Sequence, residues 1–474
     1  MSAPGWLAGA DRDSPWRELS VTVAGTGISG ASAVRALRSL GATVTAVDAA
    51  TDDASRERAG QLQALGATVV LGPAASITLP PGTQLVITSP GWRPDSPLLE
   101  TAAASGVPVW GDVELAWRLR GPRAAPWLAL TGTNGKTTTV GMLAAMLGAD
   151  GRHAAAVGNV GSPVLDAVLA EQPYDVLAVE LSSFQLHWSP SVAPHAGAVL
   201  NIAPDHLDWH GDFDSYAEAK AGVWRGNAIS IGNADDSATA GRLARVDGRR
   251  VTFTLAEPAA GQLGVADGWL VDRAFGDGPR RLALADRLRP TGAHNAANAL
   301  AAAALALSIG VSPEAVAAGL AAYRPDSHRN ELVLTRDGIA WVDDSKATNP
   351  HAAAAALASY DSVVWIAGGL NKGLDYDDVV RLAAPRLRAA IVIGESRRHV
   401  AEALARHAPD VPVVDIGATD TTAMVAVVRE AAALARRGDT VLLAPAAASM
   451  DMFRDYKHRG DAFADAVRAV VGHA

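Results

Sequence analysis

The chain has 474 residues, of which 49% are hydrophobic and 19% are charged, and it contains no cysteine. This composition is typical of a folded protein of roughly three domains, and the missing cysteines exclude disulfides, thiolate-bound zinc and a cysteine nucleophile. The formal charge of −9 argues against a general nucleic-acid-binding or anionic-membrane-binding surface, so no nucleic-acid partner is expected.

The N-terminal stretch, MSAPGWLAGADRDSPWRELS, contains Pro, Asp and Arg before any apolar core of a secretory signal could form. The most apolar run of the chain, ALAAAALAL near residue 300, is too short and too rich in alanine to span a bilayer. We therefore expect a cytoplasmic protein without membrane insertion.

Three successive series of strand, turn and helix predict an α/β fold with mainly parallel sheets. The first series runs through LSVTVAG, ATVTAVD, ATVVLG and TQLVITSPG. The second runs through PWLALTG, YDVLAVELSS and GAVLNI, and the third through IAWVDDS, SVVWIAGG, AAIVIGE and DTVLLAPA. Charged, proline-containing stretches at 118–126 and 323–329 are typical of linkers. The predicted domains are therefore 1–122, 123–326 and 327–474.

Two further patterns refine this organisation. Short β-like stretches between Gly and Asp turns in 230–290 predict a small extra sheet within the central domain. Alanine tracts at 296–305 and 351–357 predict packed helices, because alanine has the highest helix propensity.

The first glycine-rich loop, VAGTGISG, follows a predicted strand and opens a predicted helix. Gly25, Gly27 and Gly30 fit the pattern G-x-G-x-x-G, and Asp48 ends the next strand, as in dinucleotide-binding sites. Backbone N–H groups at a helix N-terminus favour a phosphate group, which NAD and a nucleotide-sugar diphosphate both carry. A tight turn that serves only helix packing is the structural alternative.

The second glycine-rich loop lies within LALTGTNGKTTTVGML, where a helix is predicted to begin near Lys136. The Walker A pattern requires a glycine six residues before the lysine, and Leu130 stands there. Even so, successive N–H groups of 132–135 can surround a phosphate, and Lys136 can reach the β- and γ-phosphates. The hydroxyl of Thr137 or Thr138 can bind Mg²⁺. A capped turn with a solvated lysine is the alternative.

Two downstream features supply what an ATP site needs. Glu180 ends the predicted strand in LAVELSSFQL, where a magnesium ligand would lie beside the phosphate loop. The segment NIAPDHLDWHGDFDSYAEAK gathers polar groups around a loop-to-helix junction, namely Asp205, His206, Asp208, His210 and Lys220. By itself this segment fits an exposed acidic loop equally well. It supports an ATP site only because a phosphate loop is also present.

Together these motifs resemble the Mur ligases of peptidoglycan synthesis. The residues that carry the resemblance are GTNGKTTT, ELSSFQL, NIAPDHLDWHG, AHNAANALAAAAL, HRNELV, DDSKATNPHA, AGGLNKG and PAAASMDMF, which cover all three predicted domains in order. The family has the shorter phosphate loop G-T-N-G-K-T, so Leu130 in place of the Walker A glycine does not argue against a nucleotide site. DDSKATNP followed by GGLNKG favours the branch of the family that adds D-glutamate.

The resemblance implies a Rossmann-like UDP-binding domain, a central P-loop-type ATPase domain and a Rossmann-like C-terminal domain. It implies ATP-dependent ligation of D-glutamate to UDP-N-acetylmuramoyl-L-alanine, through an acyl phosphate and a tetrahedral intermediate. Expected cofactors are ATP and two Mg²⁺ ions, for which Mn²⁺ can substitute, and the expected oligomeric state is a monomer.

The resemblance also implies residues for each ligand. UDP-substrate contacts are expected from Gly27, Ile28, Ser29, Asp48, Ser89, Pro90, Gly91, Asn159 and His206. ATP contacts are expected from Gly132, Thr133, Asn134, Gly135, Lys136, Thr137, Thr138, Asn295, Asn298, Arg329, Asp344 and Lys346. D-Glutamate contacts are expected from Thr348, Lys372, Ser449 and Tyr456. Metal ligands are expected to be Thr137, Glu180, His206 and Lys220, with Lys220 carbamylated, and the catalytic residues to be Lys136, His206 and Lys220.

Two positions depart from the family pattern. Ala49 and Ala50 follow Asp48 where better-known members have Thr-Arg, which puts uridine and phosphate contacts there in doubt. Tyr456 replaces a phenylalanine that works mainly through its backbone.

Three other functions remain open at this stage. A sister Mur enzyme or a folylpolyglutamate synthase shares the superfamily, although the chain lacks the DNPR motif of a diaminopimelate-adding relative. An NAD-dependent dehydrogenase could be built on GTGISG, but it would leave the second loop unexplained. A P-loop regulator that hydrolyses ATP would release phosphate without either substrate.

Overall fold

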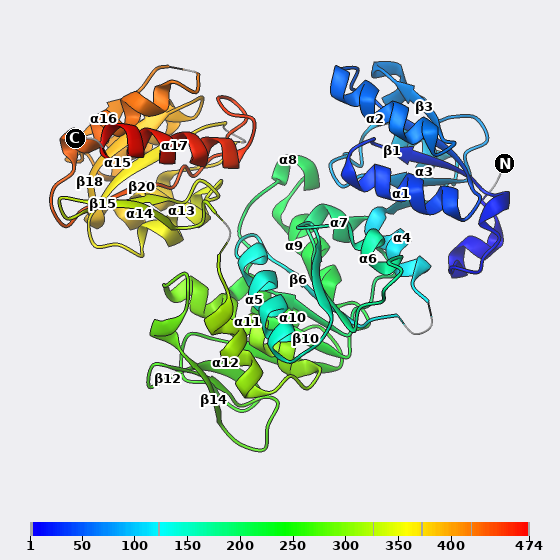
Figure 1. Ribbon diagram of the computed structural model, residues 1–474, viewed down its shortest axis with the longest axis horizontal. Coiled ribbons are helices and arrows are strands. Elements are labelled where there is room, and N and C mark those ends of the chain that lie inside the picture. The colour runs from blue at the N-terminus through cyan, green and yellow to red at the C-terminus, as the bar shows by residue number, and fades with distance from the viewer. Residues whose placement is uncertain (1–2, 122–123, 326, 371–372, 419, 473–474) are drawn as a thin grey trace. The chain divides into compact units, whose positions relative to one another are not determined.

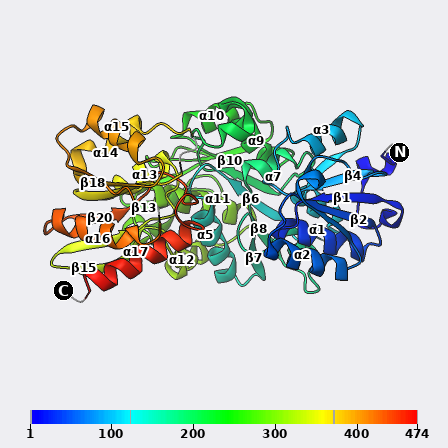
Figure 2. The same cartoon turned by 90° about the horizontal axis from the view of Figure 1, so that it is seen from above.

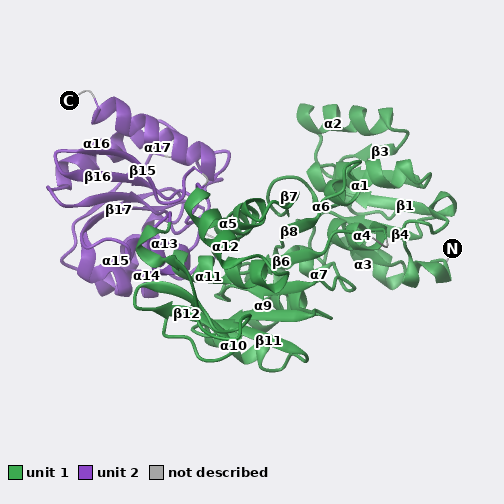
Figure 3. Ribbon diagram, turned by 60° about the horizontal axis from the view of Figure 1, so that its bottom comes forward, with its two compact units in different colours: residues 1–288, 295–323 green, residues 289–294, 324–474 purple. Residues whose placement is uncertain are grey.

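The structure, a computed structural model, describes residues 3–121, 124–325, 327–370, 373–418 and 420–472 (Figure 1). The chain forms two compact units, the first of residues 1–288 and 295–323 and the second of residues 289–294 and 324–474 (Figure 3). The first unit contains a five-stranded and a nine-stranded sheet, and the second a six-stranded sheet. The three expected α/β domains are confirmed. Their boundaries near 122 and 326 fall on residues outside the described ranges and stay predictions.

The N-terminal sheet has the order β3-β2-β1-β4-β5, with every pair of neighbours parallel. Its strands are β1 (Ser20–Ala24), β2 (Thr43–Asp48), β3 (Thr68–Leu71), β4 (Leu85–Thr88) and β5 (Val109–Gly111). Its helices are α1 (Ile28–Ser39), α2 (Asp53–Ala64), α3 (Pro97–Ala104) and α4 (Asp112–Leu119). Helices α1 and α2 cover one face and α3 the other (Figure 2). In such a sheet, ligands bind at the carboxyl ends of the strands where the strand order reverses.

The central sheet has the order β14-β13-β12-β11-β10-β9-β6-β8-β7. Its strands are β6 (Trp127–Thr131), β7 (Ala154–Gly158), β8 (Val176–Glu180), β9 (Ala196–Val199), β10 (Ile229–Asn233), β11 (Arg249–Phe253), β12 (Gln262–Ala266), β13 (Trp269–Asp272) and β14 (Arg280–Leu284). The helices are α5 (Lys136–Ala149), α6 (Val164–Val168), α7 (Ser183–His187), α8 (Leu207–His210), α9 (Phe213–Ala221), α10 (Ser237–Leu243), α11 (Ala293–Ser308) and α12 (Pro313–Ala322).

The expectation of a small extra sheet in 230–290 is wrong. The strands predicted there do form, but β10 pairs in parallel with β9, and β11 and β12 continue outward from it. Only β13 and β14 are antiparallel additions at the far edge. The buried, apolar strand Ile229–Asn233 has no exposed edge at which a second sheet could start, so the main sheet continues through it.

The C-terminal sheet has the order β15-β16-β20-β17-β18-β19. Its strands are β15 (Glu331–Arg336), β16 (Ile339–Asp343), β17 (Val363–Gly368), β18 (Leu387–Ile393), β19 (Val413–Asp415) and β20 (Thr440–Leu443). Its helices are α13 (Pro350–Leu357), α14 (Asp377–Ala383), α15 (Arg397–His407), α16 (Ala423–Leu434) and α17 (Tyr456–Val470). All pairs are parallel except β15 with β16.

The hydrophobic cores follow the two units. One core cluster is continuous from α1 and the first sheet to the α6 and α9 side of the central sheet, and includes Leu37, Trp127, Leu165 and Tyr216. A second cluster lies between the central sheet and α5, α11 and α12. The C-terminal sheet has a separate cluster on each face. Among the described residues, no helix is both long and apolar enough to cross a membrane.

Candidate active site

The predicted phosphate loop connects β6 to α5, which begins at Lys136 as expected. Gly135 has a positive φ of 84°, and a Cβ there would lie 2.3 Å from Asn298 Oδ1, so only glycine fits. The loop is held from both sides, because Asn134 N donates to Asn201 Oδ1 at 2.9 Å and Thr133 shares a 2.8 Å hydrogen bond with the Tyr216 hydroxyl. The N–H groups at the start of α5 are therefore held in place for an anion.

Two lysines converge on this loop. Lys136 Nζ donates to the carbonyl oxygens of Gly132 and Thr133 at 2.8 and 2.9 Å, and Lys220 Nζ donates to the same Gly132 oxygen at 2.8 Å. Lys220 is 2% exposed. Burial, and then the neighbouring Lys136 ammonium, hold the pKa of Lys220 well below its ordinary value, although Asp205 and Glu180 act in the opposite direction. A buried lysine of this kind has an amine that is readily available uncharged.

Glu180 lies at the end of β8 and is 1% exposed. One carboxylate oxygen accepts a 2.8 Å hydrogen bond from Asn159 Nδ2, which brings two predicted site residues together. The other oxygen is buried and has no hydrogen-bond partner among the described residues. An unpartnered buried carboxylate oxygen is costly, and a magnesium ion would satisfy it as an oxygen ligand. This observation fits the predicted metal role.

His206 stands before α8 with a positive φ of 53°, an uncommon conformation for a residue with a side chain. Its ring packs 4.8 Å from Phe184, whose ring stacks on His210 at 5.6 Å, and His210 contacts Tyr216 at 5.3 Å. Burial, with help from nearby cations, lowers the pKa of His210 to about 4. These rings link His206 to the phosphate loop through Tyr216.

The predicted metal ligands do not form a ready-made cluster. Among the described residues, no three His, Asp or Glu side chains are grouped so as to hold a metal ion. The predicted set instead needs Thr137 and a modified Lys220 beside Glu180 and His206. An unmodified lysine in its ammonium form has no acceptor to offer a metal.

The predicted adenine pair lies on α11. Asn298 Nδ2 donates to Asn295 Oδ1 at 3.2 Å, and both residues are buried. The Asn298 side chain also lies beside Gly135 of the phosphate loop, which the sequence did not predict.

The first glycine-rich loop precedes α1, as the fingerprint predicts. Gly25 has a φ of 101°, and a Cβ on Gly30 would lie 1.9 Å from the Gly25 carbonyl oxygen, so both positions require glycine. Ser89 Oγ is buried beside Gly25 without a partner among the described residues. Ile28, at the start of α1, is 77% exposed. Pro90 and Gly91 follow Ser89 at the carboxyl end of β4, at the same edge of the sheet.

Asp48 serves this loop directly. Its carboxylate accepts 2.8 Å hydrogen bonds from Thr26 N and Oγ1 and a 3.0 Å bond from Ala50 N. Burial acts to raise the pKa of Asp48, but these hydrogen bonds and Arg58 together hold it below its usual range. Ala50, one of the two positions that differ from the family pattern, therefore contributes its backbone N–H to Asp48.

Ser29, at the tip of the loop, has a partner that sequence reasoning missed. Its side chain lies near Asp112, the first residue of α4, and acts to lower the pKa of that carboxyl. Asp112 is 2% exposed, its Oδ1 atom has no partner among the described residues, and burial raises its pKa to about 6. The sequence did contain a signal for Asp112, because it is an acidic residue directly after the strand β5. Tyr216 and Asn201, which hold the phosphate loop, carried no comparable signal.

The second unit groups most of its predicted residues at one edge of its sheet. Asp344 and Lys346 follow β16, and Ser449, which is 4% exposed, lies beyond β20, the neighbouring parallel strand. Lys346 Nζ lies 3.7 Å from the centre of the Tyr456 ring, so these two predicted site residues are in contact.

The other predicted residues of this unit lie nearby in sequence. Thr348 N donates to the Lys346 carbonyl oxygen at 2.9 Å. Desolvation raises the pKa of Asp344 to about 7, against a hydrogen bond from Asn330 N and the charge of Arg329. Lys372 lies outside the described residues.

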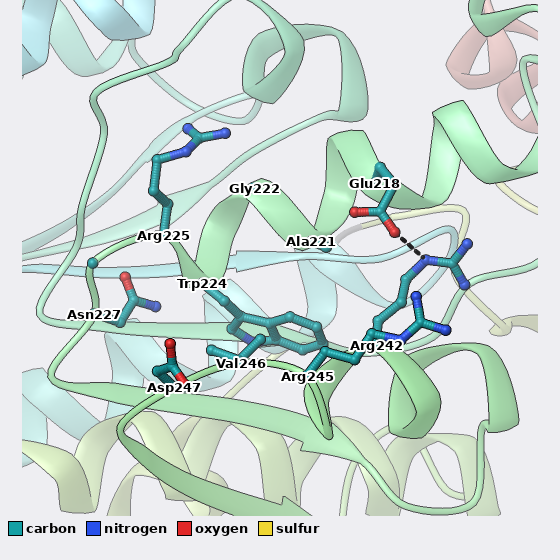
Figure 4. Close-up of a pocket in the computed structure, with 11 residues that line it drawn as sticks. Glu218, Ala221, Gly222, Trp224, Arg225, Asn227, Arg242, Arg245, Val246 and Asp247 are labelled. Atoms are coloured by element: carbon teal, nitrogen blue, oxygen red, sulfur yellow. Dashed lines mark hydrogen bonds and ion pairs between the residues drawn. The ribbon is translucent and has the colours of Figure 1, made fainter.

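A separate cavity of about 500 Å³ lies at the C-terminal end of α9, between it and the segment that follows α10 (Figure 4). It is lined by Glu218, Ala221, Gly222, Trp224, Arg225, Gly226, Asn227, Arg242, Arg245, Val246 and Asp247, none of which is a predicted site residue. Arg242 pairs with Asp214 and Glu218 at 2.7 and 3.2 Å, which offsets its charge. Since none of the lining residues is a predicted site residue, we do not assign the cavity to the phosphate site.

Comparison with known proteins identifies matches along most of the chain. The family description "Mur ligase MurD-like, N-terminal domain" matches residues 19–111, "Mur ligase middle domain" matches 130–306, and "Mur ligase, glutamate ligase domain" matches 328–447. A relative from Streptomyces avermitilis, named UDP-N-acetylmuramoylalanine–D-glutamate ligase, is 57% identical over 464 residues, which cover 96% of this chain and 99% of the relative.

Solved structures share the fold at low sequence identity. UDP-N-acetylmuramate-alanine ligase MurC of Thermotoga maritima has a TM-score of 0.57 at 19% identity, over 95% of this chain and 99% of that protein. A bifunctional folylpolyglutamate synthase/dihydrofolate synthase with Mn, AMPPNP and L-glutamate bound has a TM-score of 0.51 at 20% identity, over 73% of this chain and 90% of that protein.

Proposed function

Because the chain belongs to the Mur ligase family, we propose that it joins D-glutamate to UDP-N-acetylmuramoyl-L-alanine and converts ATP to ADP and phosphate. The single observation that best supports this activity is the pair of lysines at the phosphate loop. Lys136 and Lys220 converge on the Gly132 carbonyl, close to a Glu180 oxygen that lacks a partner among the described residues.

The chemistry explains why cations must gather there. A carboxylate is a poor electrophile, so the alanyl carboxylate first takes the γ-phosphoryl group of ATP and becomes an acyl phosphate. The amine of D-glutamate then attacks its carbonyl carbon, and phosphate leaves from the tetrahedral intermediate. Both steps bring anions together, and two unit charges about 4 Å apart repel by roughly 4 kcal/mol at an effective dielectric constant near 20. Lys136 would offset this repulsion, together with the N–H groups of the loop other than those of Thr133 and Asn134, which donate to Asn201.

Thr137, Glu180, His206 and a carbamylated Lys220 would hold the metal, with Lys220 and Glu180 as anionic oxygen ligands. Mg²⁺ bound there would supply positive charge to the phosphoryl oxygens. The depressed pKa and burial of Lys220 support the modification, because only an uncharged amine can add carbon dioxide. Mn²⁺ would occupy the same ligands.

Each remaining ligand has a proposed place. UDP would bind at Gly27, Ile28 and Ser29, with Asp48, Ser89, Pro90 and Gly91 around it. Asn159 and His206 would contact the rest of that substrate. Asn295 and Asn298 would contact adenine, and Arg329, Asp344 and Lys346 would approach ATP from the second unit. D-Glutamate carries two carboxylates, for which Lys372 is the cationic candidate and Thr348, Ser449 and Tyr456 complete the pocket. We propose that the enzyme works as a cytoplasmic monomer.

A coupled phosphate-release assay tests this function. We expect phosphate release only when ATP, UDP-N-acetylmuramoyl-L-alanine and D-glutamate are all present, and none with L-glutamate or diaminopimelate. Lys136→Ala serves as the inactive control. Phosphate release without either substrate would favour an ATPase regulator, and release with another amino acid or acceptor would favour a sister ligase.

A further inference from the structure

A polar bridge around Asp166 joins the first two domains. Asp166 lies on α6, and its carboxylate accepts a short hydrogen bond from the Ser32 hydroxyl of α1. It also pairs with Arg35, one turn further along α1, at 3.0 and 3.2 Å. Ser32 is fully buried, whereas the Arg35 and Asp166 side chains remain 50% and 38% exposed. Since water screens an exposed ion pair, the buried Ser32 bond is the part that holds α1 in position.

The bridge connects two loops that the proposed function assigns to one substrate. Ser32 lies in the second turn of α1, whose N-terminus follows Gly27. On the other side, α6 follows the loop that carries Asn159, and Gly158 N donates to Ser162 O at 3.0 Å within that loop. Asn159 in turn donates to Glu180 at 2.8 Å. Asp166 therefore ties the UDP loop to the Glu180 edge of the central sheet.

Other contacts keep the two domains together independently of this bridge. Glu114 on α4 is fully buried, and it accepts hydrogen bonds from Ser191 N at 3.0 Å and from Ser191 Oγ at 2.5 Å, besides its ion pair with Arg118. Gly111 N donates to Trp188 O at 2.9 Å. Because the hydrophobic core is also shared, loss of the Asp166 bridge should shift α1 without unfolding the unit.

We propose that Asp166 is a positioning residue, which through Ser32 sets the distance between the UDP-binding loop and the reaction centre. The inference rests on the proposed function, in which one end of the substrate is held at the N-terminus of α1 while its alanyl carboxylate reacts beside Lys136. A substrate held at both ends cannot adapt to a displaced loop without moving its reacting group. A misplacement of about 1 Å can slow a reaction about 100-fold.

Four variants separate the parts of the bridge. Ser32→Ala and Asp166→Ala remove the buried bond, and we expect each to lower kcat about 10- to 100-fold. The KM values for ATP and D-glutamate, and the affinity for UDP alone measured by calorimetry, should stay unchanged. Arg35→Ala removes only the exposed pair and should stay within about twofold of the unmodified enzyme. Asp166→Asn keeps an acceptor for Ser32 and should restore most of the activity.

The matched control is Asp53→Ala, which removes an exposed aspartate that pairs with Arg56 inside the first domain and bridges nothing. Its kinetics should not change. Hydrogen exchange provides a readout independent of catalysis, because amides of α1 should exchange faster in Asp166→Ala and at the usual rate in Asp53→Ala.

Unchanged kcat in both Ser32→Ala and Asp166→Ala would overturn the proposal. A loss of UDP affinity as large as the loss of kcat would also overturn it, because the bridge would then serve binding or folding of the loop. If the unmodified enzyme showed no D-glutamate-dependent phosphate release, the proposed function would fail, and the exchange comparison would still report whether Asp166 holds α1.

Discussion

At the scale of single residues, buried polar groups mark the site more clearly than charge does. Glu180 was singled out in the sequence only because a phosphate loop preceded it, since a strand-end glutamate is usually a solvated charge. Its burial and unpartnered oxygen could not be predicted, because they depend on β7 and β8 lying side by side. Ser89 and Asp112 have the same property at the other glycine loop.

Lys220→Ala should lower kcat by roughly 100-fold or more, because the carbamate oxygens would be lost from the metal site. Short carboxylic acids that imitate the carbamate should restore part of the activity. The measurement is phosphate release with and without added acetate or formate. Arg242→Ala, on α10 beside the cavity, is the control, and it should be active without rescue. A fully active alanine variant would remove Lys220 from the reaction.

Asp112 should make stability depend on pH. Its pKa is about 6 in the folded chain against 3.8 as the ordinary value, so between these values the folded state binds more protons than the unfolded state. Stability contributed by this residue therefore falls as pH rises from about 4 to about 6, by on the order of 3 kcal/mol, and is constant above that. Denaturation of Asp112→Asn at pH 4.5 and pH 7 should show a smaller loss than the unmodified chain; equal losses would contradict this assignment.

At the scale of elements, local signals predicted strands, helices and glycine turns well. The start of α5 at Lys136 follows from Gly135, and α11 and α13 contain the predicted alanine tracts. Which strands pair could not be predicted, and the strands in 230–290 were assigned to a separate sheet for that reason. Bonds such as Tyr216 to Thr133 or Ser32 to Asp166 join residues far apart in sequence, so no local pattern reveals them.

Gly30→Ala should displace α1 from the first glycine loop, because its Cβ would meet the Gly25 carbonyl oxygen. We expect the affinity for UDP to fall at least about tenfold, while an ATP analogue binds as before. The matched control is Gly60→Ala in α2, where nothing lies within 4 Å of the new Cβ, and this change should stabilise the protein slightly. Calorimetric titration with each ligand measures both effects. Normal UDP affinity in Gly30→Ala would contradict this prediction, because the loop would then accommodate the Cβ without losing the ligand.

At the scale of the whole molecule, the proposed ATP site draws on both units. The phosphate loop belongs to the first unit, and Arg329, Asp344 and Lys346 belong to the second. Ligand-induced domain closure is a common way to assemble such a site. Small-angle scattering should therefore show a smaller radius of gyration with an ATP analogue and UDP-substrate than without ligands. An unchanged radius would indicate that ATP is held by the first unit alone.

The hydrophobic core shared by the first two domains governs how the protein melts. Residues of one packed cluster lose their contacts together, so these domains should unfold in a single cooperative transition, and the C-terminal domain, which has its own cores, in another. Scanning calorimetry should resolve two transitions, and UDP-substrate should raise the temperature of the one with the larger enthalpy. A domain that shares its core with a neighbour cannot be excised without exposing apolar surface, so the N-terminal domain of this ligase should not be stable when it is produced alone.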